Sequence, residues 1–186
     1  MAGDKDRFKA ATPEGMPQII KYDGICDIDG LYKLIQQWFV DQGFYFEEPT
    51  IKHKVPSPAG AEQDQDMRGW RNVNEYVRFN LKVYLKIRDL KEIEVIKEGK
   101  KKRLSKCRLR IYIAGDIELD WQGKFDKSPF LQQLKKFYNK YIIKEDEGII
   151  GGVWWDQLYY RMFKLTTIIK EFLDMESKGN AYYDMW

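Results

Sequence analysis

Residues 77–88 read VRFNLKVYLKIR. Every odd position from Val77 to Ile87 is apolar, and every even position except Tyr84 carries a charge or an amide. An alternation with a period of two is typical of a strand that buries one of its faces. The stretch therefore predicts a broad sheet as the body of the protein, with most of its charged side chains on the solvent face.

The flanking sequence predicts further strands and helices. Apolar residues recur at helical spacing from Leu31 to Phe39, after Ser128-Pro129 and over Trp154–Met175. The predicted strands are Phe44–Glu47, Thr50–Val55, Trp70–Arg88, Glu92–Lys97 and Arg103–Trp121, with a loop over residues 56–66 and turns near Lys91 and Gly99. We expect an α+β fold, in which an antiparallel β-meander of four to five strands has one N-terminal and two C-terminal helices packed on one face.

Three segments divide the chain of 186 residues. Residues 1–22 are polar and proline-containing, which predicts an extended N-terminal arm. Residues 23–175 are predicted to form a single α+β domain, and residues 176–186 an aromatic C-terminal tail. A chain of this length can bury a substantial core.

Composition narrows the function classes. Hydrophobic residues make up 44% of the chain and charged residues 33%, which predicts a globular protein rather than a disordered one. The net charge of +3 gives no overall bias toward polyanions, so only a local patch would bind one. The polar start predicts no signal peptide, and no apolar run approaches the roughly 18–20 residues of a membrane helix, so we expect a cytoplasmic protein without membrane insertion. Cys26 and Cys107 lack metal-type spacing and are predicted to be reduced packing residues.

Basic residues gather between Lys97 and Arg110. The predicted turns would place Glu92 and Glu94 between two basic strands, in a solvated ladder of opposite charges worth roughly 0.2–1 kcal/mol per pair. The alternative is a nucleic-acid-binding module in which phosphates contact this hairpin and Tyr84 or Tyr112 is exposed. The candidate contacts of that alternative are Lys100, Lys101, Lys102, Arg103, Lys106 and Arg108.

No catalytic motif occurs in the sequence. Asp116, Glu118 and Asp120 alternate on the last predicted strand and would face the same way, which suits Mg²⁺ or Ca²⁺ and a metal-dependent hydrolase or nuclease as a second alternative. Pairing with basic residues of the neighbouring strand is the simpler interpretation. His53 is the only histidine and has no evident catalytic partner in the sequence. We therefore predict a non-enzymatic protein without a cofactor or a resident metal.

Aromatic residues make up 15% of the chain. Adjacent tryptophans on a helix point in different directions, and aromatic and Met side chains are favoured at protein interfaces. We predict a structural or interaction protein that binds other copies of itself through its N-terminal arm and C-terminal tail, with docking of the tail on its own chain as the alternative. The predicted anchors are Trp154, Trp155, Tyr182, Tyr183, Met185 and Trp186.

Several short motifs carry a resemblance. The motifs are Tyr22-Asp23-Gly24, Asp29-Gly30-Leu31-Tyr32, Asp116-Ile117-Glu118-Leu119-Asp120 and Leu158-Tyr159-Tyr160. With them, the chain resembles small archaeal proteins of unknown function over most of Tyr22–Met175. The resemblance implies no activity and assigns no catalytic residue.

Overall fold

The computed structural model describes residues 7–9, 17–57, 60–97, 100–143 and 150–175. The strands are β1 (Arg7–Lys9), β2 (Gln18–Cys26), β3 (Tyr45–Ser57), β4 (Gly60–Asn72), β5 (Val77–Lys97) and β6 (Lys100–Leu119). The helices are α1 (Ile28–Asp41), α2 (Pro129–Phe137) and α3 (Asp156–Phe172), with π-helical segments η1 (Tyr138–Ile143) and η2 (Ile150–Trp155). All strand pairs are antiparallel, β3-β4-β5-β6 form a meander, and β1 and β2 both pair with β6. The predicted α+β class with an antiparallel meander is confirmed.

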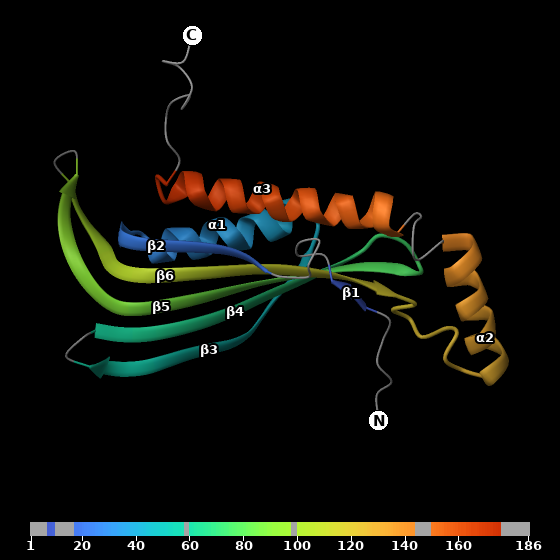
Figure 1. The fold of residues 1–186 in the computed structure, drawn as a ribbon. Coiled ribbons are helices and arrows are strands. Elements are labelled where there is room, and N and C mark those ends of the chain that lie inside the picture. Colours follow the sequence, from blue (N-terminus) through green and yellow to red (C-terminus); the bar gives the residue numbers. More distant parts are fainter. Residues whose placement is uncertain (1–6, 10–16, 58–59, 98–99, 144–149, 176–186) are drawn as a thin grey trace, which may run out of the picture.

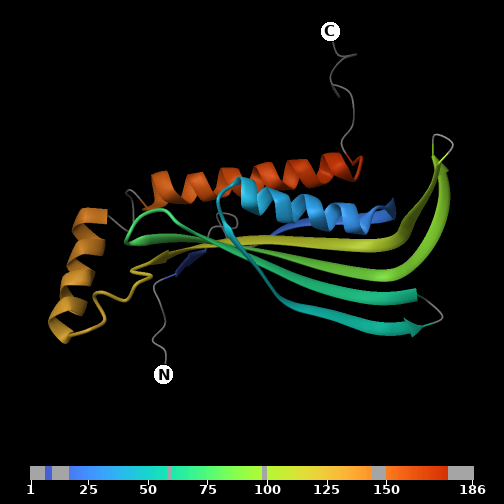
Figure 2. The same ribbon diagram turned by 180° about the vertical axis from the view of Figure 1, so that it is seen from behind.

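The core lies between the sheet and two helices, α1 and α3, which cover the same face (Figures 1 and 2). The odd-numbered residues from Val77 to Ile87 are all buried, so the alternation that predicted a half-buried strand is confirmed. They pack with Ile111 and Ile113 of β6, Phe39 of α1 and Leu165 of α3. Burying such side chains is the main favourable term in folding, at about 25 cal/mol per Å² of apolar surface.

The N-terminal part of the chain joins the sheet earlier than the sequence suggested. Residues 18–22 belong to β2, which pairs with β6 from Gln18 opposite Ile113 to Cys26 opposite Ser105. Only Ile20 and Cys26 of this strand are buried hydrophobic residues. An edge strand with so few buried positions gives a weak alternation, and this is why the sequence pattern does not reveal it.

The region between residues 56 and 77 differs from the prediction. The expected loop over residues 56–66 is largely strand, because β4 begins at Gly60. The expected long strand from Trp70 to Arg88 is in fact the end of β4, a turn and the start of β5. At the turn, the Asn74 side-chain oxygen accepts hydrogen bonds from the backbone N–H groups of Tyr76 (2.8 Å) and Val77 (2.7 Å). An Asn that bonds the backbone ahead of it in this way stabilises a turn.

The predicted turn near Lys91 is a β-bulge instead. Asp89 and Leu90 on β5 oppose the single residue Cys107 on β6, and the strands stay paired on both sides. Asp89 has a φ of 55°, the left-handed conformation that Asp tolerates better than most residues. A bulge bends a strand and increases its twist, and the β5–β6 hairpin curls sharply beyond this part of the sheet (Figures 1 and 2).

Helix α2 does not lie where the sequence predicts it. It stands at one end of the sheet rather than on the face that α1 and α3 cover (Figure 1), and none of its residues is buried. Tyr138, directly after α2, packs against Tyr76 and Phe125 with ring centroids 5.4 and 6.4 Å apart. No helix in the described residues is long and apolar enough to cross a membrane.

Candidate nucleic-acid interface

The face opposite α1 and α3, here called the open face, carries the even-numbered residues of β5 from Arg78 to Arg88 and of β6 from Lys106 to Asp116. Their odd-numbered neighbours point into the core, because successive side chains on a strand alternate between faces. No helix within the described ranges lies over the middle of this face (Figures 1 and 2).

Three cations lie side by side across the open face. Lys21 on β2 is opposite Arg110 on β6, and Arg110 is opposite Lys86 on β5. Like charges directly opposite each other on neighbouring strands destabilise a sheet. In the part of the chain that the structure describes, no carboxylate forms an ion pair with any of the three. Asp64 on β4 lies opposite Lys86 and interacts with its charge, so the described fold compensates the repulsion within this basic row only in part.

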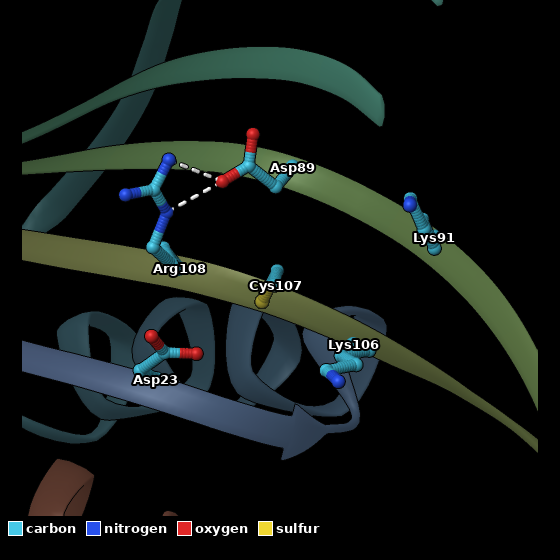
Figure 3. Close-up of a pocket in the computed structure, with 6 residues that line it drawn as sticks. All are labelled: Asp23, Asp89, Lys91, Lys106, Cys107 and Arg108. Carbon is cyan, nitrogen blue, oxygen red and sulfur yellow. Dashed lines mark hydrogen bonds and ion pairs between the residues drawn. The ribbon is translucent and has the colours of Figure 1, made fainter. Parts of the chain in front are cut away.

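A second cationic pair borders the basic row. Arg88 is opposite Arg108, and both arginines are bound by carboxylates. The Arg88 Nη1 atom lies 2.7 Å from the Asp64 Oδ1 atom, and Arg108 is paired with Asp89, as Figure 3 shows. Lys86, Arg88, Arg108 and Arg110 together line a pocket of about 230 Å³. Cationic donors gathered around a small cavity favour a phosphate-like anion.

An aromatic pair lies on the other side of the basic row. Tyr84 and Tyr112 are opposite each other, with ring centroids 6.0 Å apart. With Pro17, Lys82 and Ala114 they line a pocket of about 290 Å³. Each tyrosine is two residues from a cation of the basic row, which is about 7 Å along a strand. An apolar site for a ring therefore lies beside a cationic site for an anion.

Tyr84 is held in place by its neighbour on β4. Burial raises the pKa of Tyr84, and a hydrogen bond to the Asp64 carboxylate raises it further. The phenol therefore stays neutral and uncharged near the basic row. A neutral aromatic ring can stack on a base irrespective of the base sequence.

The residues predicted to bind nucleic acid divide into three groups. Lys106 and Arg108 lie on the open face, and Lys106 is opposite Lys91. Figure 3 shows both lysines farther along the hairpin than the Arg108–Asp89 pair, around a pocket of about 580 Å³. Lys101 and Arg103 are exposed closer to the tip of the hairpin. Lys100 and Lys102 belong to β6, but their side chains lie outside the described residues.

The predicted ladder of opposite charges is wrong in its register. Glu92 is opposite Ser105 and Glu94 is opposite Arg103, so neither glutamate separates two basic strands as expected. The bulge keeps β5 running past Lys91, and Lys86 consequently lies opposite Arg110. The basic row therefore does not follow from the sequence pattern, although the alternation placed Lys86 and Arg110 on solvent faces.

The three carboxylates considered for a metal site do not converge. Asn80 donates from Nδ2 to Asp116 Oδ2 (2.8 Å) and to Glu118 Oε2 (3.2 Å). Asp120 has a φ of 50° and accepts hydrogen bonds from the backbone N–H groups of Lys124 (2.9 Å) and Phe125 (3.2 Å). Among the described residues there is no group of three or more His, Cys, Asp or Glu side chains that could hold a metal ion.

The predicted interface anchors are partly engaged within the chain. Trp154 packs edge-on against Phe79 with centroids 6.3 Å apart, and Trp155 stacks on Tyr159 at 5.3 Å. Both tryptophans are half-buried. The other predicted anchors, Tyr182, Tyr183, Met185 and Trp186, lie outside the described residues. His53 lies in β3 opposite Gln63, and its side chain is likewise outside them.

Comparison of the chain with models of known protein families and with curated proteins finds no match. The resemblance to small archaeal proteins therefore stays a prediction. The geometry of the open face is therefore the evidence on which a proposed function rests.

Proposed function

We propose that the protein binds single-stranded nucleic acid on the open face of its sheet. The observation that carries the proposal is the basic row of Lys21, Arg110 and Lys86, three adjacent cations of which Lys86 alone has a carboxylate, Asp64, opposite it in the described sheet. Phosphates bound there would remove a repulsion that the free protein retains. Electrostatic attraction to phosphate supplies most of the sequence-independent affinity of such proteins.

The aromatic pair favours single strands over duplexes. Tyr84 and Tyr112 lie beside the basic row, so a strand with its phosphates on the cations can place a base on the rings. In a duplex the bases are stacked on each other and their faces are not accessible. Stacking of a base on an aromatic side chain contributes about 1–3 kcal/mol.

The charges on the open face also indicate the direction in which a bound nucleic acid would run. Asp64 and Asp66 on β4 border the basic row on one side, and both are bound by basic side chains, Arg88 and Arg68 respectively. Cations continue along the hairpin to Lys91 and Lys106. We therefore propose that the nucleic acid follows β5 and β6 toward the hairpin tip rather than crossing to β3.

The test is the salt dependence of binding, measured by fluorescence anisotropy with a labelled single strand of about 12 nucleotides and the matching duplex. We expect the single strand to bind more tightly. The double variant Lys86→Gln and Arg110→Gln should bind the single strand more weakly and lower the slope of log K against log salt by about 1.4. The matched control, Lys33→Gln and Lys164→Gln, removes two exposed lysines from the helical face and should bind like the parent.

Two results would contradict the proposal. One is binding of neither oligonucleotide at low salt. The other is equal weakening by the open-face variant and the helical-face control, because a general effect of net charge does not depend on position. Circular dichroism of both variants would establish that each is folded.

A further inference from the structure

The two cysteines of the chain lie together in space. Cys26 is the last residue of β2 and Cys107 lies in β6, and their Sγ atoms are 3.7 Å apart. Both thiols are free and buried, as the predicted packing role requires, but they are not isolated from each other. The sequence separation of 81 residues hides this contact. The contact arises because β2 pairs with β6, which is the last strand of the sheet along the chain.

The environment makes the two thiols unlike. A hydrogen bond from Cys107 lowers the pKa of Cys26, whereas the same bond and burial raise the pKa of Cys107. Cys26 is also the more exposed residue, at 7% against 2% for Cys107. The thiolate is the reactive form of cysteine. Because Cys26 is the more exposed of the pair, it is the sulfur that an oxidant reaches first, and Cys107 is the resolving thiol.

Closing a bond between them needs little movement. A disulfide has an S–S length of about 2.05 Å, so the two sulfurs must approach by about 1.7 Å. In the described sheet β2 has β6 as its one neighbour, and Asp27, the N-cap of α1, follows Cys26 directly. The residue opposite Cys107 is Gly24, and the Tyr22 side chain lies over the position that a Gly24 side chain would take.

We propose that Cys26 and Cys107 are a redox modification site, at which a peroxide forms an intrachain disulfide that links β2 to β6. In the first step the Cys26 sulfur attacks one oxygen of hydrogen peroxide, the O–O bond breaks, and sulfenic acid and water form. In the second step the Cys107 sulfur attacks the sulfenic sulfur and displaces a second water. Two thiols and one peroxide thus give one disulfide and two waters, and the peroxide is the species reduced.

A small oxidant suits this site better than a bulky one. Both sulfurs are almost covered, so hydrogen peroxide reaches Cys26 more readily than a glutathione-sized disulfide does. The product would tie the edge strand that carries Lys21 to the centre of the sheet. The inference does not depend on nucleic-acid binding, because its readout is the mass of the protein.

The test is mass spectrometry of the folded protein before and after hydrogen peroxide. We expect a loss of about 2 Da, for the two thiol hydrogens, that dithiothreitol reverses. Proteolysis without reductant should then yield a fragment that joins the peptides of Cys26 and Cys107. The Cys107→Ala variant should accumulate sulfenic acid at Cys26, trapped by dimedone, and the Cys26→Ala variant should trap much less at Cys107.

One comparison decides against the site. If the folded parent keeps two titratable thiols at a peroxide dose that labels Cys26 in Cys107→Ala, the pair does not close and the inference is wrong. A disulfide that forms only between two chains would also overturn it.

Discussion

At the scale of single residues, Asp64 lies beside both Arg88 and Lys86 on the open face. Its carboxylate accepts a hydrogen bond from Arg88 at 2.7 Å and borders the basic row opposite Lys86. Burial alone would raise the pKa of Asp64, but hydrogen bonds from Arg88 and Tyr84 and the charges of Arg88 and Lys86 outweigh it and lower the pKa. The folded state thus holds the ionised form more strongly than the unfolded chain does.

This shift sets the sign of a pH dependence. A carboxyl with a lowered pKa in the folded state stabilises the protein above its unfolded value of about 3.9, and the contribution disappears as the pH falls through the lower folded value. We expect Asp64→Asn to flatten the loss of stability below about pH 4 and to lower the free energy of unfolding at pH 7 by up to about 1 kcal/mol. Urea unfolding at a series of pH values measures both effects. Arg88→Met should reduce the same slope, and an unchanged slope in both variants would disprove the assignment.

The basic row shows which part of the site the sequence contains. The alternation of residues 77–88 correctly placed Lys86 on a solvent face, because the period of a strand depends on local sequence alone. Which residue lies opposite Lys86 depends on the register with β6, and one bulge residue changes it. Lys21 was missed for a second reason, since it belongs to an edge strand with few buried positions.

At the scale of elements, Asp120 connects the sheet to α2. It accepts hydrogen bonds from two backbone N–H groups after β6, and its Oδ2 atom lies 3.5 Å from the Lys135 Nζ atom on α2. Asp120→Ala should lower the free energy of unfolding by about 2–4 kcal/mol, because it leaves partly buried donors unpaired and places Ala at a positive φ. Asp120→Asn keeps an acceptor and should cost less.

Hydrogen exchange identifies where that loss occurs. We expect the amides of α2 to exchange faster in Asp120→Ala than in the parent, while the amides of β5 keep their protection. Equal acceleration in both elements would show that the side chain supports the whole fold rather than the attachment of α2.

The position of α2 marks a limit of pattern analysis. Its apolar residues recur at helical spacing, which correctly predicts a helix. The same pattern predicts a buried face, yet Phe130 is 74% exposed and Leu134, Phe137 and Tyr141 are also exposed. Periodicity identifies an apolar face, but it does not identify which surface covers it.

At the scale of the whole molecule, self-association through the arm and the tail stays a proposal. Trp154 and Trp155 already pack within the chain, so the proposed contact depends chiefly on Tyr182, Tyr183, Met185 and Trp186. Deletion of residues 177–186 should give a smaller species with unchanged circular dichroism, because the core described here ends before the tail. Light scattering of both proteins measures the mass. An unchanged oligomeric state after deletion would show that the tail does not join the copies.

The layers of the fold were predictable, and the connections between them were less so. Residues 77–88 and the helical spacing after Trp154 identify a sheet with helices on one face, since burial imposes these periods directly. The bulge at Asp89 and the Asn74 turn were missed, because each depends on a single residue whose conformation competes with a regular pattern. Local sequence patterns therefore predict the fold class. The pairing of residues between strands depends instead on single residues at the bulge and at the turn.

The bulge at Asp89 and Leu90 has a consequence for how this hairpin can change in evolution. Two residues on β5 oppose one residue on β6. The residues that follow the bulge on β5 therefore point to the opposite face from the one that an unbroken alternation would give them. Loss of either bulge residue would exchange the side chains from Lys91 to Val95 between the two faces at once. We therefore expect the outer hairpin to tolerate insertions or deletions in pairs, one residue on each strand. Insertion or deletion of a single residue at the bulge would instead exchange the side chains of the two faces of β5 beyond it.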